Sequence, residues 1–137
     1  MTSLEYIQKS AQKGWRFNLL IPDTEIDNLC LIHPLKQRQV EQIVFHAKQD
    51  ENVNRIIVFG SATTNRCNPF SDLDICIDWK LPSHDEDGVF VPETRPLMKL
   101  ISSITEGKAD VLAYDDVTNE MMKRQINEGV IVYEYNV

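Results

Sequence analysis

Two short apolar segments, joined by a glycine-serine pair and a polar connection, constrain the fold of this 137-residue chain more than any other feature. The first segment, residues 55–59, ends at Gly60-Ser61, and ten residues later Asp72 and Asp74 open the second, residues 72–78. Short apolar runs bounded by turn residues are typical of β-strands. Because alternate side chains of a strand point to one face, we expect Asp72 and Asp74 to lie side by side.

The paired carboxylates indicate a bound cation. Two carboxylates this close repel each other unless a positive charge lies between them. Hard oxygen ligands suit Mg²⁺, which keeps several waters and is usually completed by substrate phosphates. Gly60 lets the backbone approach a ligand, and the Ser61 hydroxyl and nearby amides are suited to a phosphate oxygen. Together these residues predict a site for a nucleoside triphosphate and its metals.

A third acid is expected, because two-metal phosphoryl chemistry holds the attacking and leaving oxygens with ions about 3.5–4 Å apart. The best candidate is Asp110, whose predicted strand, 108–114, is able to lie beside 72–79 and bring Asp110 opposite the aspartate pair. There it would accept or orient the proton of an attacking hydroxyl. The alternative is a strand-end aspartate bonded to a backbone amide.

The rest of the chain alternates helical and strand patterns. Apolar spacing and turn residues predict helices over 3–13, 34–49, 92–106 and 117–127. Strands are predicted over 54–59, 72–79, 108–114 and 130–135. Residues 15–21 are expected to be a strand or an extended segment, 23–27 to open a short helix, and 80–91 to form a loop that flanks the site.

These patterns predict an α+β (mixed α/β) fold. We expect a twisted mixed β-sheet of about four to five strands with helices packed on one face. Residues 1–137 are expected to form a single domain, with 1–32 as an N-terminal extension.

Charge and cysteine content narrow the class of function. The net charge is −7: residues 1–48 carry six Lys or Arg against five Asp or Glu, whereas 49–137 carry eight against sixteen. Without a basic stripe, strong nucleic-acid binding is not expected, and a basic protein partner or a metal-carried substrate fits better. Three cysteines without metal-type spacing favour reduced thiols. No apolar stretch of about 18 residues and no signal peptide is visible, so we expect a cytoplasmic protein that does not enter a membrane.

Other candidates have simpler structural explanations. Asp115 and Asp116 are expected at a helix N-cap, and Asp78 is expected to be solvated. His84 is expected to be a solvated loop residue, although contact with a nucleotide or metal is the alternative. The Met121-Met122 pair is expected in the core or on a surface that faces a partner.

The spacing of Gly60-Ser61 and Asp72-Leu73-Asp74 resembles the signature of the polymerase-β-type nucleotidyltransferase superfamily. The small size and residues 126–134 are similar to its minimal nucleotidyltransferases. The resemblance implies two Mg²⁺ ions, a polymerase-β-like nucleotidyltransferase core, and transfer of a nucleoside monophosphate, AMP from ATP, to an acceptor hydroxyl with release of pyrophosphate. It also implies that Ser61 holds the triphosphate, that Asp72 and Asp74 bind both metals, and that Asp110 binds the catalytic metal.

The same resemblance implies a partner. Minimal members are often antitoxins that attach AMP to a HEPN-type ribonuclease toxin. Many members carry an Arg-Gly pair just after the turn, where this chain has Thr63-Thr64-Asn65. Arg66 is able to supply the missing positive charge, and a surface arginine is the alternative. A non-catalytic antitoxin that occludes its partner stays open, and a drug-modifying enzyme is disfavoured because the chain is short. Acceptor recognition is expected from a toxin-like partner, from a homo-oligomer, or from residues 1–32.

Overall fold

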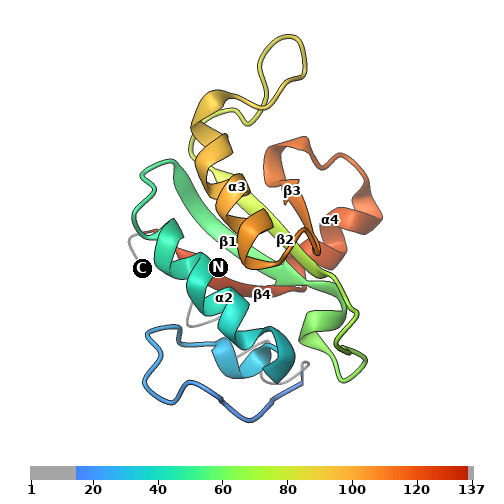
Figure 1. Cartoon of the computed structure of the whole chain (residues 1–137). Helices are drawn as coiled ribbons and strands as arrows, with labels where there is room; N and C mark the ends of the chain where they lie inside the picture. The colour runs from blue at the N-terminus through green and yellow to red at the C-terminus, as the bar shows by residue number, and fades with distance from the viewer. Residues whose placement is uncertain (1–14, 136–137) are drawn as a thin grey trace.

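The computed structural model describes residues 15–135, so the helix predicted over 3–13 lies outside the described residues. Within them, four strands form one mixed sheet in the order β3-β2-β1-β4 (Figure 1). The strands are β1 (Val53–Phe59), β2 (Leu73–Trp79), β3 (Ala109–Ala113) and β4 (Val130–Glu134). β1 runs antiparallel to β2 and β4, whereas β2 and β3 are parallel. A parallel pair needs a long crossover connection, and the segment containing α3 (Arg95–Ile104) supplies it.

Local signals set the ends of the helices. α2 (Pro34–Ala47) has proline at its first position, and Nδ1 of His33 accepts the Leu35 N–H at 3.2 Å. A 3₁₀ turn (Pro92–Thr94) leads into α3. α4 (Glu120–Asn127) begins three residues later than predicted, because Asn119 is its N-cap and accepts the Met122 N–H at 3.0 Å.

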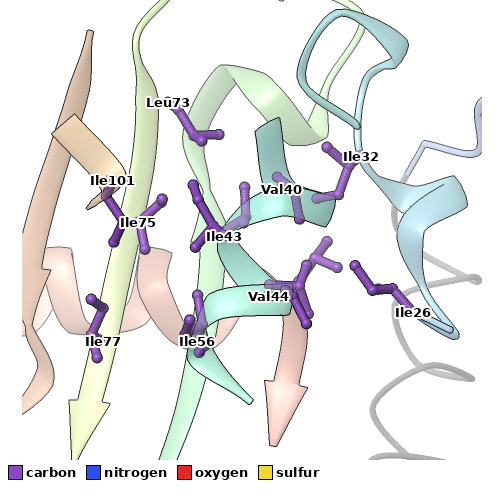
Figure 2. Close-up of a cluster of buried hydrophobic side chains, with 14 of the residues drawn as sticks. Ile26, Ile32, Val40, Ile43, Val44, Ile56, Leu73, Ile75, Ile77 and Ile101 are labelled. Carbon is purple, nitrogen blue, oxygen red and sulfur yellow. The ribbon is translucent and has the colours of Figure 1, made fainter. Parts of the chain in front are cut away.

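The main core lies between the sheet and the pair α2 and α3. Ile56 of β1 and Ile75 of β2 point toward Ile43 of α2 and Ile101 of α3, and all four are fully or almost fully buried (Figure 2). Burying a side chain of this size contributes about 1.5–3 kcal/mol to folding. Leu35 is apolar but 48% exposed, because the buried stripe of α2 begins one residue later, at Lys36.

The opposite face of the sheet has a smaller cover. Ile126 of α4 is buried there against Ile57, Phe59 and Cys76, which alternate with the residues of the main core. The predicted arrangement with helices on one face therefore describes α2 and α3, and α4 adds a partial cover on the other side. Asp74 lies two residues before Cys76, so its side chain belongs to this more open face.

The segment before α2 packs against the sheet layer without forming a strand. Residues 15–21 have no regular structure, which agrees with the extended alternative, and Gln37 of α2 holds them by hydrogen bonds. The short helix expected at 23–27 is wrong. The Thr24 hydroxyl bonds to Glu41 and accepts the Ile26 N–H, and such side-chain bonds compete with helix formation. Only a 3₁₀ turn follows (Leu29–Leu31).

Two further expectations concern the whole chain. Among residues 15–135, no helix is both long enough and apolar enough to span a membrane. Cys30, Cys67 and Cys76 are free thiols; the latter two are buried and Cys30 is half-buried.

Candidate functional site

The turn after β1 (Gly60–Thr63) forms one side of the candidate site. Gly60 has a φ of +74°, which favours glycine. A Cβ built on Gly60 would overlap Oδ2 of Asp74, so the backbone of the turn lies directly against that carboxylate. The glycine is therefore required twice, once by its backbone conformation and once by the approach to Asp74.

Neighbouring strands bring the carboxylates together. Asp74 of β2 and Asp110 of β3 are paired residues in the parallel register, so their side chains share one face of the sheet. Asp72 directly precedes β2 and lies two residues before Asp74, on the same side. The predicted juxtaposition of Asp110 with the aspartate pair is thus present in the structure.

Asp74 carries the electrostatic signature of this arrangement. Burial, followed by the negative charges of Asp110 and Asp72, raises the pKa of the half-buried Asp74 carboxyl. Within residues 15–135, none of the three carboxylates has a hydrogen-bonding side chain or an ion-pair partner; the two ion pairs there are Lys48–Glu25 and Arg55–Asp78. Uncompensated carboxylates of this kind favour a bound cation, and oxygen ligands fit Mg²⁺.

The three acids form an open set. In the described part of the chain, no three His, Cys, Asp or Glu side chains approach closely enough to enclose a metal ion by themselves. Waters and substrate phosphates would therefore have to supply the remaining ligands of a bound Mg²⁺, as they usually do for this ion.

The other predicted ligands differ in position. Ser61 is half-buried in the turn, and its hydroxyl makes no hydrogen bond with residues 15–135; only its carbonyl is used, by Thr64. The hydroxyl is therefore available to a ligand. Arg66 is exposed, and its backbone N–H bonds to Thr64 while its guanidinium has no partner among the described residues. The assignment of Arg66 to a phosphate therefore stays a prediction.

Sequence reasoning missed Lys36. Its residue is only 5% exposed, and its ammonium donates to the carbonyl oxygen of Ser71 at 2.6 Å, directly before Asp72. The backbone N–H of His33 also bonds to the carbonyl of Ala62 at 2.7 Å, so the start of α2 is tied to the turn. The sequence did contain a signal for the burial of Lys36, because this residue lies one helical turn before Val40 on the buried stripe of α2.

Two acidic residues have roles other than those expected. Asp115 is not a helix N-cap, because its carboxylate accepts the Ser83 hydroxyl at 2.6 Å and the Ser83 N–H at 2.9 Å. Burial opposes ionisation of Asp115, but these hydrogen bonds outweigh it and lower the pKa. Asp78 is not freely solvated: it accepts from Nε of Arg55 at 3.0 Å, and that guanidinium lies 4.7 Å from the centre of the Tyr114 ring.

His84 is also less free than predicted. It packs against Phe90 with ring centroids 4.1 Å apart, and its Nδ1 lies 2.8 Å from the Ser83 hydroxyl.

Burial, and to a lesser degree the charge of Asp78, raises the pKa of the Cys76 thiol to about 12, so this cysteine on the open face stays protonated.

Comparison with known proteins identifies the class. A mixed sheet with adjacent carboxylates beside a glycine turn is suited to the metal ions and phosphates of a phosphoryl-transfer reaction. A family model described as polymerase beta, nucleotidyltransferase, matches residues 41–137. The chain therefore belongs to the polymerase-beta nucleotidyltransferase family.

One solved structure with a similar fold is the crystal structure of the toxin-antitoxin with AMP-PNP. The match covers 71% of this chain and 74% of that chain, with a TM-score of 0.53 and 14% identity. At this identity the likeness establishes a shared fold. A search of curated proteins found no significant match.

Proposed function

We propose that this nucleotidyltransferase transfers AMP from ATP to a hydroxyl group of an acceptor protein, in a reaction that depends on Mg²⁺. The observation that carries the proposal is the pairing of Asp74 with Asp110 in register, with Asp72 alongside, against the Gly60 turn. The raised pKa of Asp74 supports it, because the three charges interact and lack a counter-ion among residues 15–135.

Each residue has a distinct role in the proposed reaction. The backbone of Gly60 and the hydroxyl of Ser61 bind the terminal phosphates. Asp110 takes the proton of the acceptor hydroxyl while the oxygen of that hydroxyl bonds to the α-phosphorus. The bond from that phosphorus to the bridging oxygen of the β-phosphate then breaks, and pyrophosphate leaves. The in-line geometry and electrostatic stabilisation carry most of the rate in this chemistry.

The donor set fits a pair of Mg²⁺ ions. Asp72 and Asp74 would hold both ions, and Asp110 would hold the one nearer the acceptor. Bound there, Mg²⁺ supplies positive charge to the phosphate oxygens and lowers the pKa of the acceptor hydroxyl.

We further propose that the acceptor is a HEPN-type ribonuclease toxin, in the cytoplasm, with this chain as its antitoxin. The resemblance of the signature residues implies this pairing, and the fold shared with one toxin-antitoxin structure supports it. The net charge of −7 also favours a basic protein partner.

Mass spectrometry and labelled ATP test the proposal. A HEPN-type toxin is incubated with this chain, Mg²⁺ and ATP labelled at the α-phosphate, and the toxin is then examined for an AMP adduct. We expect an adduct with the wild type, none with Asp74→Ala, and a normal yield with the surface control Asp23→Ala. The contradicting outcome is that no adduct forms even with the wild type, while Asp74→Ala neutralises the toxin as well as the wild type does. The protein would then act by occlusion, and the transfer proposal would be wrong.

A further inference from the structure

A groove runs along the free edge of the sheet, beside the candidate site. Its volume is about 620 Å³, and its floor is formed by consecutive residues of β3, Val111, Leu112 and Ala113. The loop before α3 and the helix α4 lie on its two sides, at the edge of the sheet that is opposite β4 (Figure 1). Asp110 directly precedes Val111 in β3, so a strand added along this edge would run past the candidate catalytic carboxylate.

The Val111 backbone at this edge makes no hydrogen bond with residues 15–135, whereas the Ala113 carbonyl caps the 3₁₀ turn Tyr114–Asp116. β3 is the last strand of the sheet and pairs only with β2. The Leu73 N–H donates to the Lys108 carbonyl at 3.0 Å, which fixes the parallel register, so Val111 and Ala113 direct their backbone groups away from β2. An open strand edge is a template for another extended chain, which gains main-chain hydrogen bonds by adding as a strand.

The groove walls are apolar. Met121 of α4 is 72% exposed, and Met122 lies next to it. The rings of His84 and Phe90, which contact each other at an interplanar angle of 35°, also line the groove. Flexible methionine side chains adapt to varied partner side chains, so this surface is suited to the alternate residues of an added strand.

The charged side chain that lines the groove is acidic. Asp116 lines it, and the exposed acids 85–87 follow His84 directly. No Lys or Arg is among its lining residues in the described part of the chain. Lys123 and Arg124 fall on the other side of α4 by helical position, and Arg95 is the nearby cation, donating to the Phe90 carbonyl at 3.4 Å. The rim thus favours a positively charged occupant.

We propose that this groove binds an extended, basic segment of the partner protein, which adds to β3 as a further strand and brings the acceptor hydroxyl to Asp110. The inference deepens the proposed function, because it names the recognition element of the acceptor. The unpaired backbone sets the extended conformation, the methionine wall binds alternate apolar side chains, and the acidic rim selects lysine or arginine.

Peptide titrations followed by NMR test the groove without nucleotide. The probe is a capped peptide of about eight residues, a strand length, that alternates lysine and valine around one serine. Its controls replace lysine with glutamate or methylate the backbone nitrogens. We expect the lysine peptide alone to shift the amide signals of Val111, Ala113 and Met121. Shifts elsewhere, or equal shifts with the glutamate or methylated peptide, would overturn the proposal.

Protein variants complete the test. Met121→Lys should weaken binding of the lysine peptide about tenfold or more, whereas Phe45→Lys, the same change at a 61% exposed position of α2, should leave it unaltered. A wild-type dimer that Met121→Lys dissociates would assign the groove to a second copy and overturn the proposal. Because binding is measured without ATP, peptide binding without any AMP transfer supports the groove and contradicts only the transferase. Transfer to an acceptor with no peptide binding contradicts only the groove.

Discussion

Among single residues, Asp74 shows most clearly how the candidate site works against the stability of the fold. Its pKa is raised by burial and by the charges of Asp110 and Asp72, so the folded protein binds the Asp74 proton more tightly than the unfolded chain does. The ionised carboxylate therefore destabilises the fold above its folded pKa. That penalty fades as the pH falls from the folded pKa to the unfolded value, about 3.9.

We predict that Asp74→Asn melts at a higher temperature than the wild type near pH 7. The difference in melting temperature should disappear below about pH 4, where the side chain at position 74 is neutral in the wild type as well as in the variant. Mg²⁺ should raise the melting temperature of the wild type and not of Asp74→Asn. Thermal unfolding over a pH series checks this, with the exposed Asp23→Asn as control. If Asp74→Asn were less stable than the wild type near pH 7, the electrostatic account would be contradicted. The variant should in any case transfer AMP about a hundredfold more slowly, or slower still.

Gly60 provides the second prediction. Gly60→Ala forces a side chain into a positive-φ position, which costs roughly 1–2 kcal/mol, and its Cβ overlaps the Asp74 carboxylate. Gly88→Ala is the matched control, because Gly88 has a φ of +77° and nothing within 4 Å of its Cβ position. Denaturant unfolding should show the backbone cost in both variants. Transfer should fall about tenfold or more only in Gly60→Ala, because misplacing a carboxylate that holds the reactants weakens catalysis; equal activity in the two variants would contradict the proposed contact.

At the scale of elements, local patterns predicted the strands and helices that bury their own apolar residues. The 72–79 and 34–49 segments carry their periodicity and turn residues within the sequence, so their structures could be found there. The misassigned residues depend on distant partners. Asp115 is held by Ser83, 32 positions away, and Thr24 bonds to Glu41, 17 positions away. Spacing within a segment carries no information on such tertiary contacts.

The candidate site divides in the same way. Gly60, Asp72 and Asp74 form a local motif, so the sequence was able to indicate them together. Asp110 required an assumption about which strand lies beside β2, and the parallel register supplies that pairing. Lys36 could not be linked to Ser71 from the sequence, because 35 positions and two elements separate them.

The junction between α2 and the β1–β2 connection gives the third prediction. Lys36→Met keeps the apolar stem and removes the ammonium that anchors the Ser71 carbonyl beside Asp72. Desolvation of the buried Lys36 ammonium opposes folding and offsets much of the hydrogen bond that it makes. The loss of stability should therefore be small, within about 1 kcal/mol. Transfer should need about tenfold more Mg²⁺ for half-maximal rate, the scale of losing a group that orients metal ligands.

The control for this variant is Lys48→Met, the same change at the other end of α2. Lys48 is exposed and pairs with Glu25 at 2.8 Å, and such surface pairs contribute little. Its Mg²⁺ dependence should equal that of the wild type. An unaltered Mg²⁺ requirement in Lys36→Met would show that the Ser71 contact serves packing alone.

For the whole molecule, the two faces of the sheet have different tasks: the first is to stabilise the fold and the second is to carry the candidate site. The face covered by α2 and α3 holds the main core, and the face with α4 carries Asp74 and Asp110. Substitutions of the carboxylates on the second face are therefore expected to change activity more than stability, whereas Ile126 and its buried neighbours there contribute to stability. The segment before α2 belongs to the first task, since Ile26, Leu29 and Ile32 are part of the main core. The side-chain amide of Asn28 also donates to the Ile131 carbonyl and so joins this segment to β4.

Gln37 is the main polar link between that segment and the body of the protein. It is fully buried; its Nε2 donates to the carbonyls of Asn18 at 2.8 Å and Ile32 at 3.0 Å, and its Oε1 accepts the Leu20 N–H at 2.8 Å. Gln37→Leu leaves the buried Ile32 carbonyl without this partner, at about 1–3 kcal/mol, whereas the backbone groups of the exposed Asn18 and Leu20 are released to water. We predict a loss of about 1–3 kcal/mol in the free energy of unfolding and faster tryptic cleavage after Arg16.

Gln39→Leu is the matched control, two positions along the same helix. The Gln39 Oε1 is buried and makes no hydrogen bond with residues 15–135, so replacing it removes an acceptor that these residues leave unsatisfied and should leave stability unchanged or raise it. Urea unfolding and timed trypsin digestion of the two variants compare them directly. If both variants lose stability equally, the loss comes from the helix itself. If only Gln37→Leu is destabilised and is cleaved faster, the Gln37 hydrogen bonds contribute to holding the segment before α2 in place.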